Sequence, residues 1–321
     1  MTLLTIRSPG ALASVQDLGR PAFQHLGVPS GGAADPVALR IANALAGNGP
    51  GAAGLELTLG GFHAEFRSEA ACGLAGADLG FQVDGRPLPP DTAFVVRPGS
   101  RLRSRGRVRG CRAYLAIHGG IDVPLVLGSR STYAPAGLGG FEGRALRSGD
   151  ELPGKGGVPV GWRADLRPTP DIVPPYPAPG SPVVLRAVRG PQASAFTAAG
   201  LATFFTAEFA VSPHADRMGY RLEGPRVEHA AEPDIVSDGP AWGSVQVPGD
   251  GWPIVLLSDR QTTGGYAKIA TVITRDVPLL AQAVPGDSVR FREVDLWEAR
   301  TVSMAAERRL RDWEERAAVS D

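Results

Sequence analysis

The segment Pro253–Ile273, PIVLLSDRQTTGGYAKIATVI, holds a dense set of side chains that could do chemistry. Two apolar runs, which predict strands, flank a polar cassette that contains Asp259, Arg260, Gln261, Thr262, Thr263, Gly264, Gly265, Tyr266 and Lys268. Arg and Lys bind carboxylate or phosphate oxygens, Thr and Gln add neutral donors and acceptors, and paired glycines let backbone N–H groups approach a ligand. A hairpin turn needs only about two special residues. The cassette therefore indicates a small anionic or amide-bearing ligand.

Three further polar loops, each with glycine, lie between apolar runs. They contribute the candidate ligand-binding residues Gln16, Asp17, Arg20, Arg130, Ser131 and Thr132, and the candidate acid Asp216. Each loop fits a second interpretation equally well, a tight turn in which Asp and Ser cap local backbone and Arg pairs with a nearby acid. Asp216 and Arg217 fit such a structural pair. The residue types alone leave both interpretations open.

Several familiar sites are missing from the sequence. It has no GxxxxGK[ST] phosphate loop, no GxSxG elbow and no HExxH motif, and Gly137–Gly143 does not fit GxGxxG spacing. The five histidines show no ligand spacing, so we expect no metal site.

Composition limits the partners. The chain has 321 residues, with 33 Lys+Arg and 33 Asp+Glu, so its formal net charge is zero. A balanced chain gives no reason to expect nucleic acid or an anionic membrane as a partner. The apolar runs have the length of strands rather than of membrane-spanning helices. Cys72 and Cys111 fit no metal or redox pattern and are expected to be reduced, buried thiols of a cytoplasmic protein.

Short apolar runs broken by Gly and Pro predict a mainly β chain. One helix is predicted by Asp35 as its cap, Pro36 as its first residue and Gly47 after its end. A second helix is expected from about Gln192, and the C-terminal tail is expected to form an amphipathic helix. The proline-rich stretch Pro153–Pro182 shows no hydrophobic periodicity and predicts a semi-rigid linker. We expect a first domain at 1–153, the linker at 154–182, a second domain at 183–295 and a C-terminal helix at 296–321.

The motifs SVQDLGR, GGIDVPLVLGSRSTY, DRMGYRLEGP, PIVLLSDRQTTGGYAKIATV and PLLAQAVPGD resemble the biotin-dependent carboxyltransferase / allophanate hydrolase subunit 2 family. The resemblance runs over nearly the whole chain. It implies a fold of two cyclophilin-like β-barrel domains in one chain, followed by the C-terminal helix.

The resemblance also implies a function. The chain would be a component of ATP-dependent 5-oxoprolinase, which opens 5-oxo-L-proline to L-glutamate, together with a KipI-like subunit and a LamB/YcsF-like subunit. ATP with Mg²⁺ would serve the complex. From their residue types, Lys268 and Arg260 are candidates to stabilise a transferring phosphoryl group, Asp259 or Asp216 to orient a cation or water, and Arg20 or Arg130 to hold the substrate carboxylate.

Two alternatives stay open at this point. One is a KipA-like regulatory protein that sequesters a KipI-like kinase inhibitor and performs no chemistry. The other is the carboxyltransferase half of a split biotin-dependent urea carboxylase/allophanate system. The sequence has no biotin-carrying lysine motif and no biotin-carboxylase segment, so covalent biotin is not expected on this chain.

Overall fold

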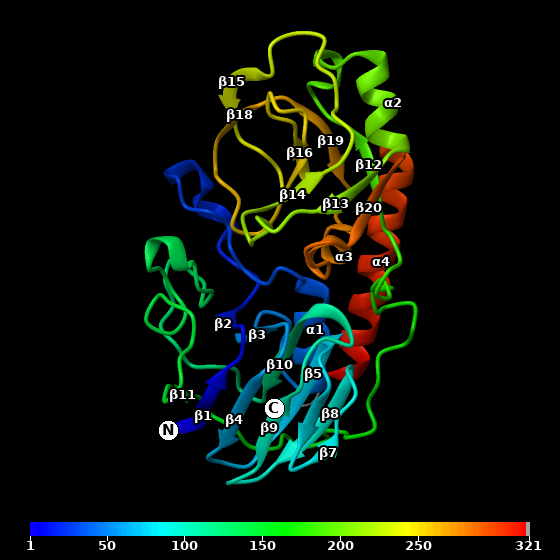
Figure 1. Ribbon diagram of the computed structural model, residues 1–321. Helices are drawn as coiled ribbons and strands as arrows, with labels where there is room; N and C mark the ends of the chain where they lie inside the picture. The colour runs from blue at the N-terminus through cyan, green and yellow to red at the C-terminus, as the bar shows by residue number, and fades with distance from the viewer. Residues whose placement is uncertain (319–321) are drawn as a thin grey trace. The chain divides into compact units, whose positions relative to one another are not determined.

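A computed structural model describes residues 1–318 and divides the chain into two compact units (Figure 1). Unit 1 comprises Met1–Arg20, Gly31–Tyr176 and Arg309–Asp321, and unit 2 comprises Pro21–Ser30 and Pro177–Arg308. The expectation of a mainly β chain with few helices is confirmed. The change from unit 1 to unit 2 at Tyr176 falls inside the proline-rich stretch. The last residues of the expected C-terminal helix, 319–321, lie outside the described part.

The strands of unit 1 form two sheets. The six-stranded sheet has the order β11 (Glu151–Pro153), β1 (Thr2–Pro9), β4 (Phe62–Phe66), β9 (Arg101–Ser104), β6 (Phe81–Val83) and β7 (Arg86–Pro87). The five-stranded sheet has the order β2 (Leu12–Gln16), β3 (Gly54–Thr58), β10 (Arg109–Ile117), β5 (Ala70–Asp78) and β8 (Thr92–Val96). All pairings within the two sheets are antiparallel. Unit 1 thus contains two sheets in the place of the expected closed barrel, and β7 and β8 are each the last strand of one sheet.

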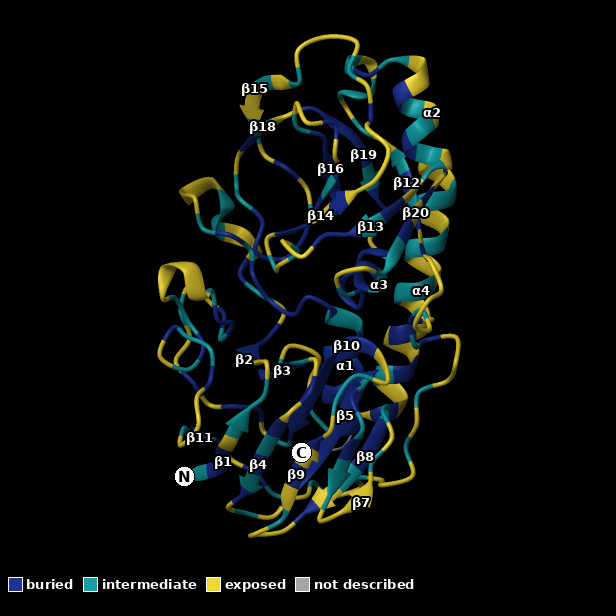
Figure 2. Ribbon diagram, viewed as in Figure 1, coloured by how far each residue is buried: buried dark blue, intermediate teal, exposed yellow. Residues whose placement is uncertain are grey.

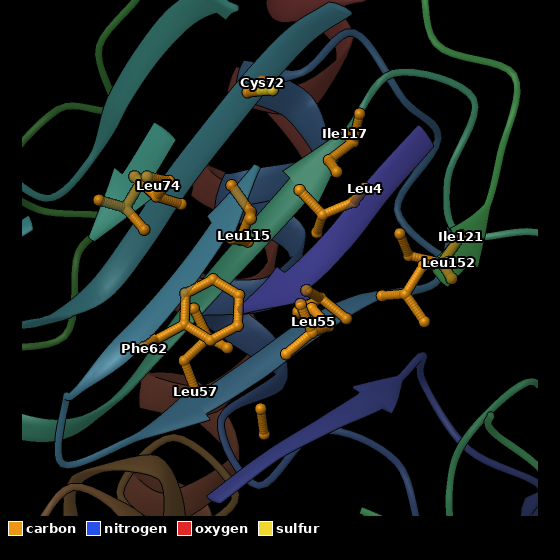
Figure 3. Close-up of a cluster of buried hydrophobic side chains, with 14 of the residues drawn as sticks. Leu4, Leu55, Leu57, Phe62, Cys72, Leu74, Leu115, Ile117, Ile121 and Leu152 are labelled. Carbon is orange, nitrogen blue, oxygen red and sulfur yellow. The ribbon is translucent and has the colours of Figure 1, made fainter. Parts of the chain in front are cut away.

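One apolar core joins the two sheets (Figure 3). Leu4 and Phe62 come from the six-stranded sheet, and Leu55, Leu74 and Leu115 from the five-stranded sheet; each is at most 1% exposed. Because side chains alternate along a strand, each sheet turns one apolar face to the other. Full burial of such a side chain contributes about 1.5–3 kcal/mol, so this shared core holds the sheets together. Cys72 and Cys111 are both buried, as expected.

Helix α1 (Pro36–Leu45) begins where the sequence predicts. The Asp35 side chain accepts a hydrogen bond from Ala38 N at 3.0 Å, and Pro36 is the first helical residue. The helix packs against the end of α4 that belongs to unit 1, where Trp313 is buried and Arg40 pairs with Glu314 at 2.6 Å. The far end of the tail helix is therefore a packing element of unit 1.

Unit 2 contains a closed barrel of seven strands. Their order is β12 (Val183–Arg189), β19 (Lys268–Val272), β16 (Ser244–Gln246), β17 (Ile254–Leu256), β14 (Gly219–Glu223), β13 (Glu208–Val211) and β20 (Ser288–Glu293). The ring closes through a parallel β12–β20 pair, whereas the other pairs are antiparallel. A separate two-stranded sheet pairs β15 (Asp234–Asp238) with β18 (Gly264–Tyr266). The expected barrel is present here.

Three helices accompany the barrel. They are α2 (Ala198–Thr206), α3 (Val277–Ala281) and α4 (Leu296–Ala317). Short 3-10 turns occur at Pro21–Leu26 and Ala193–Ala195 in unit 2 and at Ala134–Ala136 in unit 1. The helix expected from about Gln192 starts later because Thr197 is its cap and accepts from Gly200 N at 2.9 Å. Within residues 1–318, no helix has the length and apolar character needed to span a membrane.

The stretch expected to be a linker is partly anchored. Ile172 and Tyr176 are buried in unit 1, and the Tyr176 hydroxyl donates to Asp35 Oδ2 at 2.7 Å. Asp35 N in turn donates to the Tyr114 hydroxyl at 2.8 Å, and that hydroxyl donates to Glu56 Oε2 at 2.7 Å. The proline-rich stretch up to Tyr176 therefore belongs to unit 1 and is not a free spacer.

Asp91 lies close to this network and has two unfavourable features, a backbone conformation that few residues adopt and a buried carboxyl group. Its φ of 56° is in the left-handed region, which most residues avoid. Burial, with a smaller contribution from the nearby Asp35 carboxylate, raises the pKa of Asp91 from 3.8 to about 6, despite a hydrogen bond from Gly76 N and the charge of Arg109. Ionised Asp91 is thus unfavourable in the folded state.

We expect Asp91→Asn to stabilise the protein at pH 7.5 by about 2–3 kcal/mol, at 1.36 kcal/mol per pKa unit. The folded-state pKa is raised, so the stability due to protonated Asp91 is complete below pH 3.8 and is lost as the pH rises through about 6. Asn is neutral and tolerates positive φ. Urea unfolding at pH 4, 6 and 7.5 should therefore show a difference that grows with pH; a difference independent of pH would contradict this.

Candidate functional site

A pocket of about 190 Å³ lies in unit 2 beside the polar cassette. Strands β14, β16, β17 and β18 and their connecting loops supply its lining, which consists of His214, Asp216, Met218, Gly219, Arg221, Gln246, Ile254, Leu256, Gln261 and Tyr266. The lining mixes amide, carboxylate, imidazole, guanidinium and phenol groups with two aliphatic side chains. Such a mixture suits a small polar molecule with a short apolar part.

Gln246 is the most informative residue of this pocket. It is only 1% exposed, and its Oε1 accepts a hydrogen bond from Gln261 Nε2 at 3.1 Å. Its own Nε2 is buried and has no hydrogen-bond partner among the described residues. Buried polar groups are nearly always paired, so an unpaired donor in a pocket calls for an explanation. A ligand oxygen accepting from Gln246 Nε2 provides one.

Gly264 makes room for that amide. A Cβ on Gly264 would lie 2.5 Å from Gln246 Nε2 and 3.3 Å from Gln261 Nε2, too close for a side chain. Gly264 and Gly265 lie in strand β18, and neither has a positive φ. The sequence suggested a glycine pair that brings backbone N–H groups to a ligand. In the structure, Gly264 instead allows a side-chain amide to approach closely.

Asp216 lines the pocket but does not pair with Arg217. Its Oδ1 accepts from Met218 N at 2.8 Å and Gly219 N at 3.2 Å, which fixes the turn before β14. Arg217 instead binds Asp259, with Nε 2.9 Å from Oδ2 and Nη2 3.1 Å from Oδ1. The structural ion pair considered for Asp216 is therefore formed by Asp259.

Arg260 also has structural contacts. Its Nε donates to Pro240 O at 3.0 Å and its Nη1 to Leu257 O at 3.3 Å, and burial lowers the pKa of its guanidinium. Asp259 and Arg260, both buried, hold the chain between β17 and β18 and are absent from the pocket lining. Two of the candidate catalytic residues thus stabilise the cassette.

Lys268 lies close to Gln246 on the barrel. The two residues are paired across β19 and β16, so their side chains share a face of the sheet. The Lys268 Nζ lies 2.5 Å from Asp238 Oδ1; the lysine side chain is 4% exposed and the aspartate 43%. A buried ammonium with a half-exposed partner keeps a positive charge beside the buried amide.

The remaining cassette residues differ in their exposure. Gln261 and Tyr266 line the pocket, and Tyr266 is 40% exposed. Thr262 is half-buried and Thr263 is exposed, and neither belongs to the pocket lining. The cassette therefore contributes two side chains, together with Gly264 behind them, to the pocket.

The other candidate residues gather in unit 1 around Asp17. Its Oδ1 accepts from Ser129 Oγ at 2.6 Å, Ser131 Oγ at 2.5 Å and Gly19 N at 2.8 Å, and its Oδ2 accepts from Arg130 N at 2.6 Å. Asp17 is 6% exposed, so these bonds are shielded from water. A carboxylate with four donors is a fixed structural link between β2 and the loop that contains Ser129.

Arg20 and Arg130 join the same network. Arg20 is 1% exposed and its Nη2 donates to Ser131 O at 2.5 Å, while a Cβ on Gly139 would lie 2.7 Å from that nitrogen. Arg130 Nε donates to Val123 O at 2.8 Å, and its Nη2 lies 3.2 Å from Asp122 Oδ1. Both guanidinium groups thus donate to backbone carbonyls, and that of Arg130 also pairs with Asp122.

Gln16 and Thr132 complete the unit 1 cluster. Gln16 Nε2 donates to Ser14 Oγ at 3.0 Å, and Thr132 Oγ1 donates to Val15 O at 3.0 Å. Gln16 Oε1 is buried and has no hydrogen-bond partner among the described residues. The candidate residues therefore form two clusters, one in each unit, and members of the cluster in unit 2 line the pocket of about 190 Å³.

Sequence reasoning missed Gln246, His214 and Arg221. Gln246 stands in SVQVP, a run that predicts a strand, and a polar residue within such a run was the available signal. His214 lies in the loop before β14 and Arg221 within β14, on either side of Asp216, and nothing in their spacing marks them as pocket residues.

Known proteins resemble this chain along its length. The sequence is 38% identical over 302 residues to the C subunit of 5-oxoprolinase from Escherichia coli (strain K12), covering 92% of this chain and 93% of that protein. It is 34% identical to the C subunit of 5-oxoprolinase from Haemophilus influenzae, covering 89% and 90%. The solved urea amidolyase of K. lactis matches with a TM-score of 0.89 at 27% identity, covering 100% of this chain and 20% of that one.

Residues 26–293 match the family described as carboxyltransferase domain, subdomain A and B. That range contains the barrel of unit 2, its pocket and most of unit 1. Together with the similar proteins above, this match shows that the chain belongs to the carboxyltransferase subdomain A and B family and is related to the C subunits of 5-oxoprolinase.

Proposed function

We propose that this chain is the C subunit of a 5-oxoprolinase that converts 5-oxo-L-proline to L-glutamate with the help of ATP. In this proposal it works with a KipI-like subunit and a LamB/YcsF-like subunit. The observation that carries the proposal is the 38% identity to the C subunit of E. coli 5-oxoprolinase over 93% of that protein. Sequence similarity over almost the whole length of a related protein supports a shared role better than similarity confined to one motif.

The pocket of unit 2 suits a lactam. Opening the ring breaks the C–N bond and draws negative charge onto the carbonyl oxygen, which a buried N–H donor stabilises. Gln246 Nε2 is such a donor, because it is buried and unpaired among the described residues. Arg221 in the lining offers a cation for the substrate carboxylate, in place of the internally bonded Arg20 and Arg130.

The same pocket does not fit ATP. Its volume of about 190 Å³ is below the range of roughly 300–1,000 Å³ that is usual for ligand pockets. Arg260, a candidate for phosphoryl charge, donates to backbone carbonyls. In our proposal, nucleotide and Mg²⁺ bind another subunit, and this chain holds the lactam.

The test is 5-oxo-L-proline-dependent ATP hydrolysis. The chain alone, the chain with the KipI-like subunit, and both with the LamB/YcsF-like subunit are compared for ADP and glutamate release. We expect turnover only in the assembled complex. If no combination releases ADP or glutamate although the KipI-like subunit binds, the result would favour the KipA-like regulatory role instead.

A second function is favoured by other relatives. The urea amidolyase of Lachancea kluyveri is 32% identical over 92% of this chain, which spans 17% of that protein. In this alternative the chain transfers a carboxyl group from a separate biotinylated carrier. Urea-dependent activity that avidin abolishes would establish it and would exclude the lactam proposal.

Lys268→Met is expected to lower 5-oxo-L-proline-dependent ATP hydrolysis of the complex by about 10–100-fold, because it removes a buried cation next to Gln246. The apolar stem is kept and Asp238 is 43% exposed, so stability should change little. Steady-state rates and thermal unfolding check this together, with Asp238→Asn as the partner variant. Activity within a few-fold of wild type would remove Lys268 from the mechanism.

A further inference from the structure

One region of unit 1 is strongly basic. From Arg86 to Arg112 the sequence has eight arginines and a single acid, Asp91, in a chain whose net charge is zero. The five arginines from Arg86 to Arg105 form no ion pair within 4.0 Å among the described residues: Arg86, Arg97, Arg101, Arg103 and Arg105. We call these five residues the arginine face. Unpaired arginines grouped in this way create a positive surface that attracts acidic groups.

A groove of about 560 Å³ lies within this region. It is bounded by β7 and β8, the end strands of the two sheets, and both carry exposed residues (Figure 2). Its apolar lining is Val83, Pro87, Leu88, Phe94 and Val95, and its polar lining is Asp84, Arg86, Arg97 and Ser100. The groove thus combines an apolar surface with two guanidinium groups.

A second hollow of about 280 Å³ adjoins the groove through Asp84, which lines both. Its other lining residues are Gln82, Gly85, Arg101 and Arg103. Arg101 and Arg103 are two apart on β9, so they project from the same face of the sheet. Together the groove and this hollow offer four arginines to one bound segment.

The positive field of this face acts on a neighbouring residue. His63 is paired with Arg103 across β4 and β9. Burial, followed by the charges of Arg103, Arg101 and Arg7, lowers the pKa of His63, and Glu65 only partly opposes this. The arginines therefore set the local potential even though Glu65 pairs with Arg7 and Arg67.

We propose that the groove and the arginine face receive an extended acidic segment of the KipI-like subunit, an inference that rests on the proposed function. An apolar side chain of the segment lies against Phe94 and Val95, and flanking carboxylates bind Arg86 and Arg97. Sheet edges left open are places where an extended chain adds a strand, and β8 is such an edge.

The lining favours polypeptide over nucleic acid. Proteins that bind single strands stack bases on exposed aromatic side chains, whereas the one aromatic residue of this groove, Phe94, is half-buried and packs against the core. Val95, in contrast, is 40% exposed and offers an aliphatic contact. An acidic peptide with an aliphatic residue satisfies both parts of the surface.

The test measures the dissociation constant between the purified chain and the KipI-like subunit, in buffers of low and high salt. Arg86→Glu/Arg97→Glu should weaken binding by about 10-fold or more, mainly through slower association and with a flatter salt dependence. Val95→Asp should weaken it as well. The control is Arg308→Glu/Arg316→Glu, which makes the same charge change at two exposed arginines of α4.

The outcomes separate this inference from the proposed function. Equal affinity of wild type, groove variants and control variant, or a complete lack of binding to the KipI-like subunit, overturns the docking site. Loss of binding only in the groove variants supports it, whether or not the complex hydrolyses ATP with 5-oxo-L-proline. Binding of a fluorescent single-stranded DNA or of anionic vesicles that depends on Arg86 and Arg97, without an effect on binding of the KipI-like protein, also overturns it.

Discussion

Gln246→Leu is expected to lower kcat/KM for 5-oxo-L-proline by about 100-fold in the assembled complex, the usual effect of removing one donor from a developing negative charge. The leucine fills the site but offers no N–H to the carbonyl oxygen. Gln246 Nε2 has no hydrogen-bond partner among the described residues, so no hydrogen bond donated by this nitrogen to them is lost. The main loss should therefore appear in kcat, with a smaller loss of stability because Gln261 Nε2 loses its acceptor, Gln246 Oε1, at 3.1 Å. Steady-state kinetics and thermal unfolding would measure the two effects separately.

Two further variants sharpen this experiment. Gln246→Glu keeps the shape but replaces the donor by an acceptor, and it should be at least as inactive as the leucine variant. Gln282→Leu changes another fully buried glutamine of unit 2 that does not line the pocket. If Gln246→Leu and Gln282→Leu reduce activity equally, Gln246 has no special place in the reaction.

Asp17→Ala is expected to destabilise the protein by more than about 3 kcal/mol. The change leaves two serine hydroxyls and two backbone N–H groups without their shared acceptor in a buried place. Each unsatisfied buried donor costs about 1–3 kcal/mol, with partial relief where water enters. Urea unfolding monitored by tryptophan fluorescence would measure the loss, and Asp17→Asn should fall between the two proteins.

The matched control is Asp122→Ala. Asp122 also contacts the Arg130 segment, at 3.2 Å from Nη2, but its side chain is 72% exposed. An exposed ion pair contributes about 0–1 kcal/mol, so this variant should be nearly as stable as wild type. Similar losses for the two aspartates would show that burial of the Asp17 network is not what stabilises this loop.

Local features were predictable from the sequence. The start of α1 followed from Asp35 and Pro36, because a cap needs only a side chain and a backbone N–H three residues away. Alternating and apolar runs predicted the strands for the same reason, since each depends on residues adjacent in the chain. Helix α2 was placed too early because Thr197, a good cap, was not distinguished from the 3-10 turn before it.

The partners of charged residues were not predictable in this way. Asp259 meets Arg217, 42 positions earlier, and Asp17 meets Ser129 and Ser131, more than 100 positions later. No spacing rule connects residues that are so far apart in the sequence. The same residue types suit a ligand site and a buried hydrogen-bond network, and only the burial and the distances decide between them.

The family, the mainly β character and the polar loops were predictable from the amino-acid sequence alone. Those features reside in ordered motifs and local patterns. The tertiary structure decided which of the polar residues line a pocket. It assigned Asp259, Arg260, Asp17 and Arg20 to buried internal bonds and placed Gln246, with its unpaired amide, beside Gln261 and Gly264. Gln246 lies on β16 of the barrel and Gly264 on β18 of the separate two-stranded sheet, so their closeness depends on the tertiary structure and not on a local pattern.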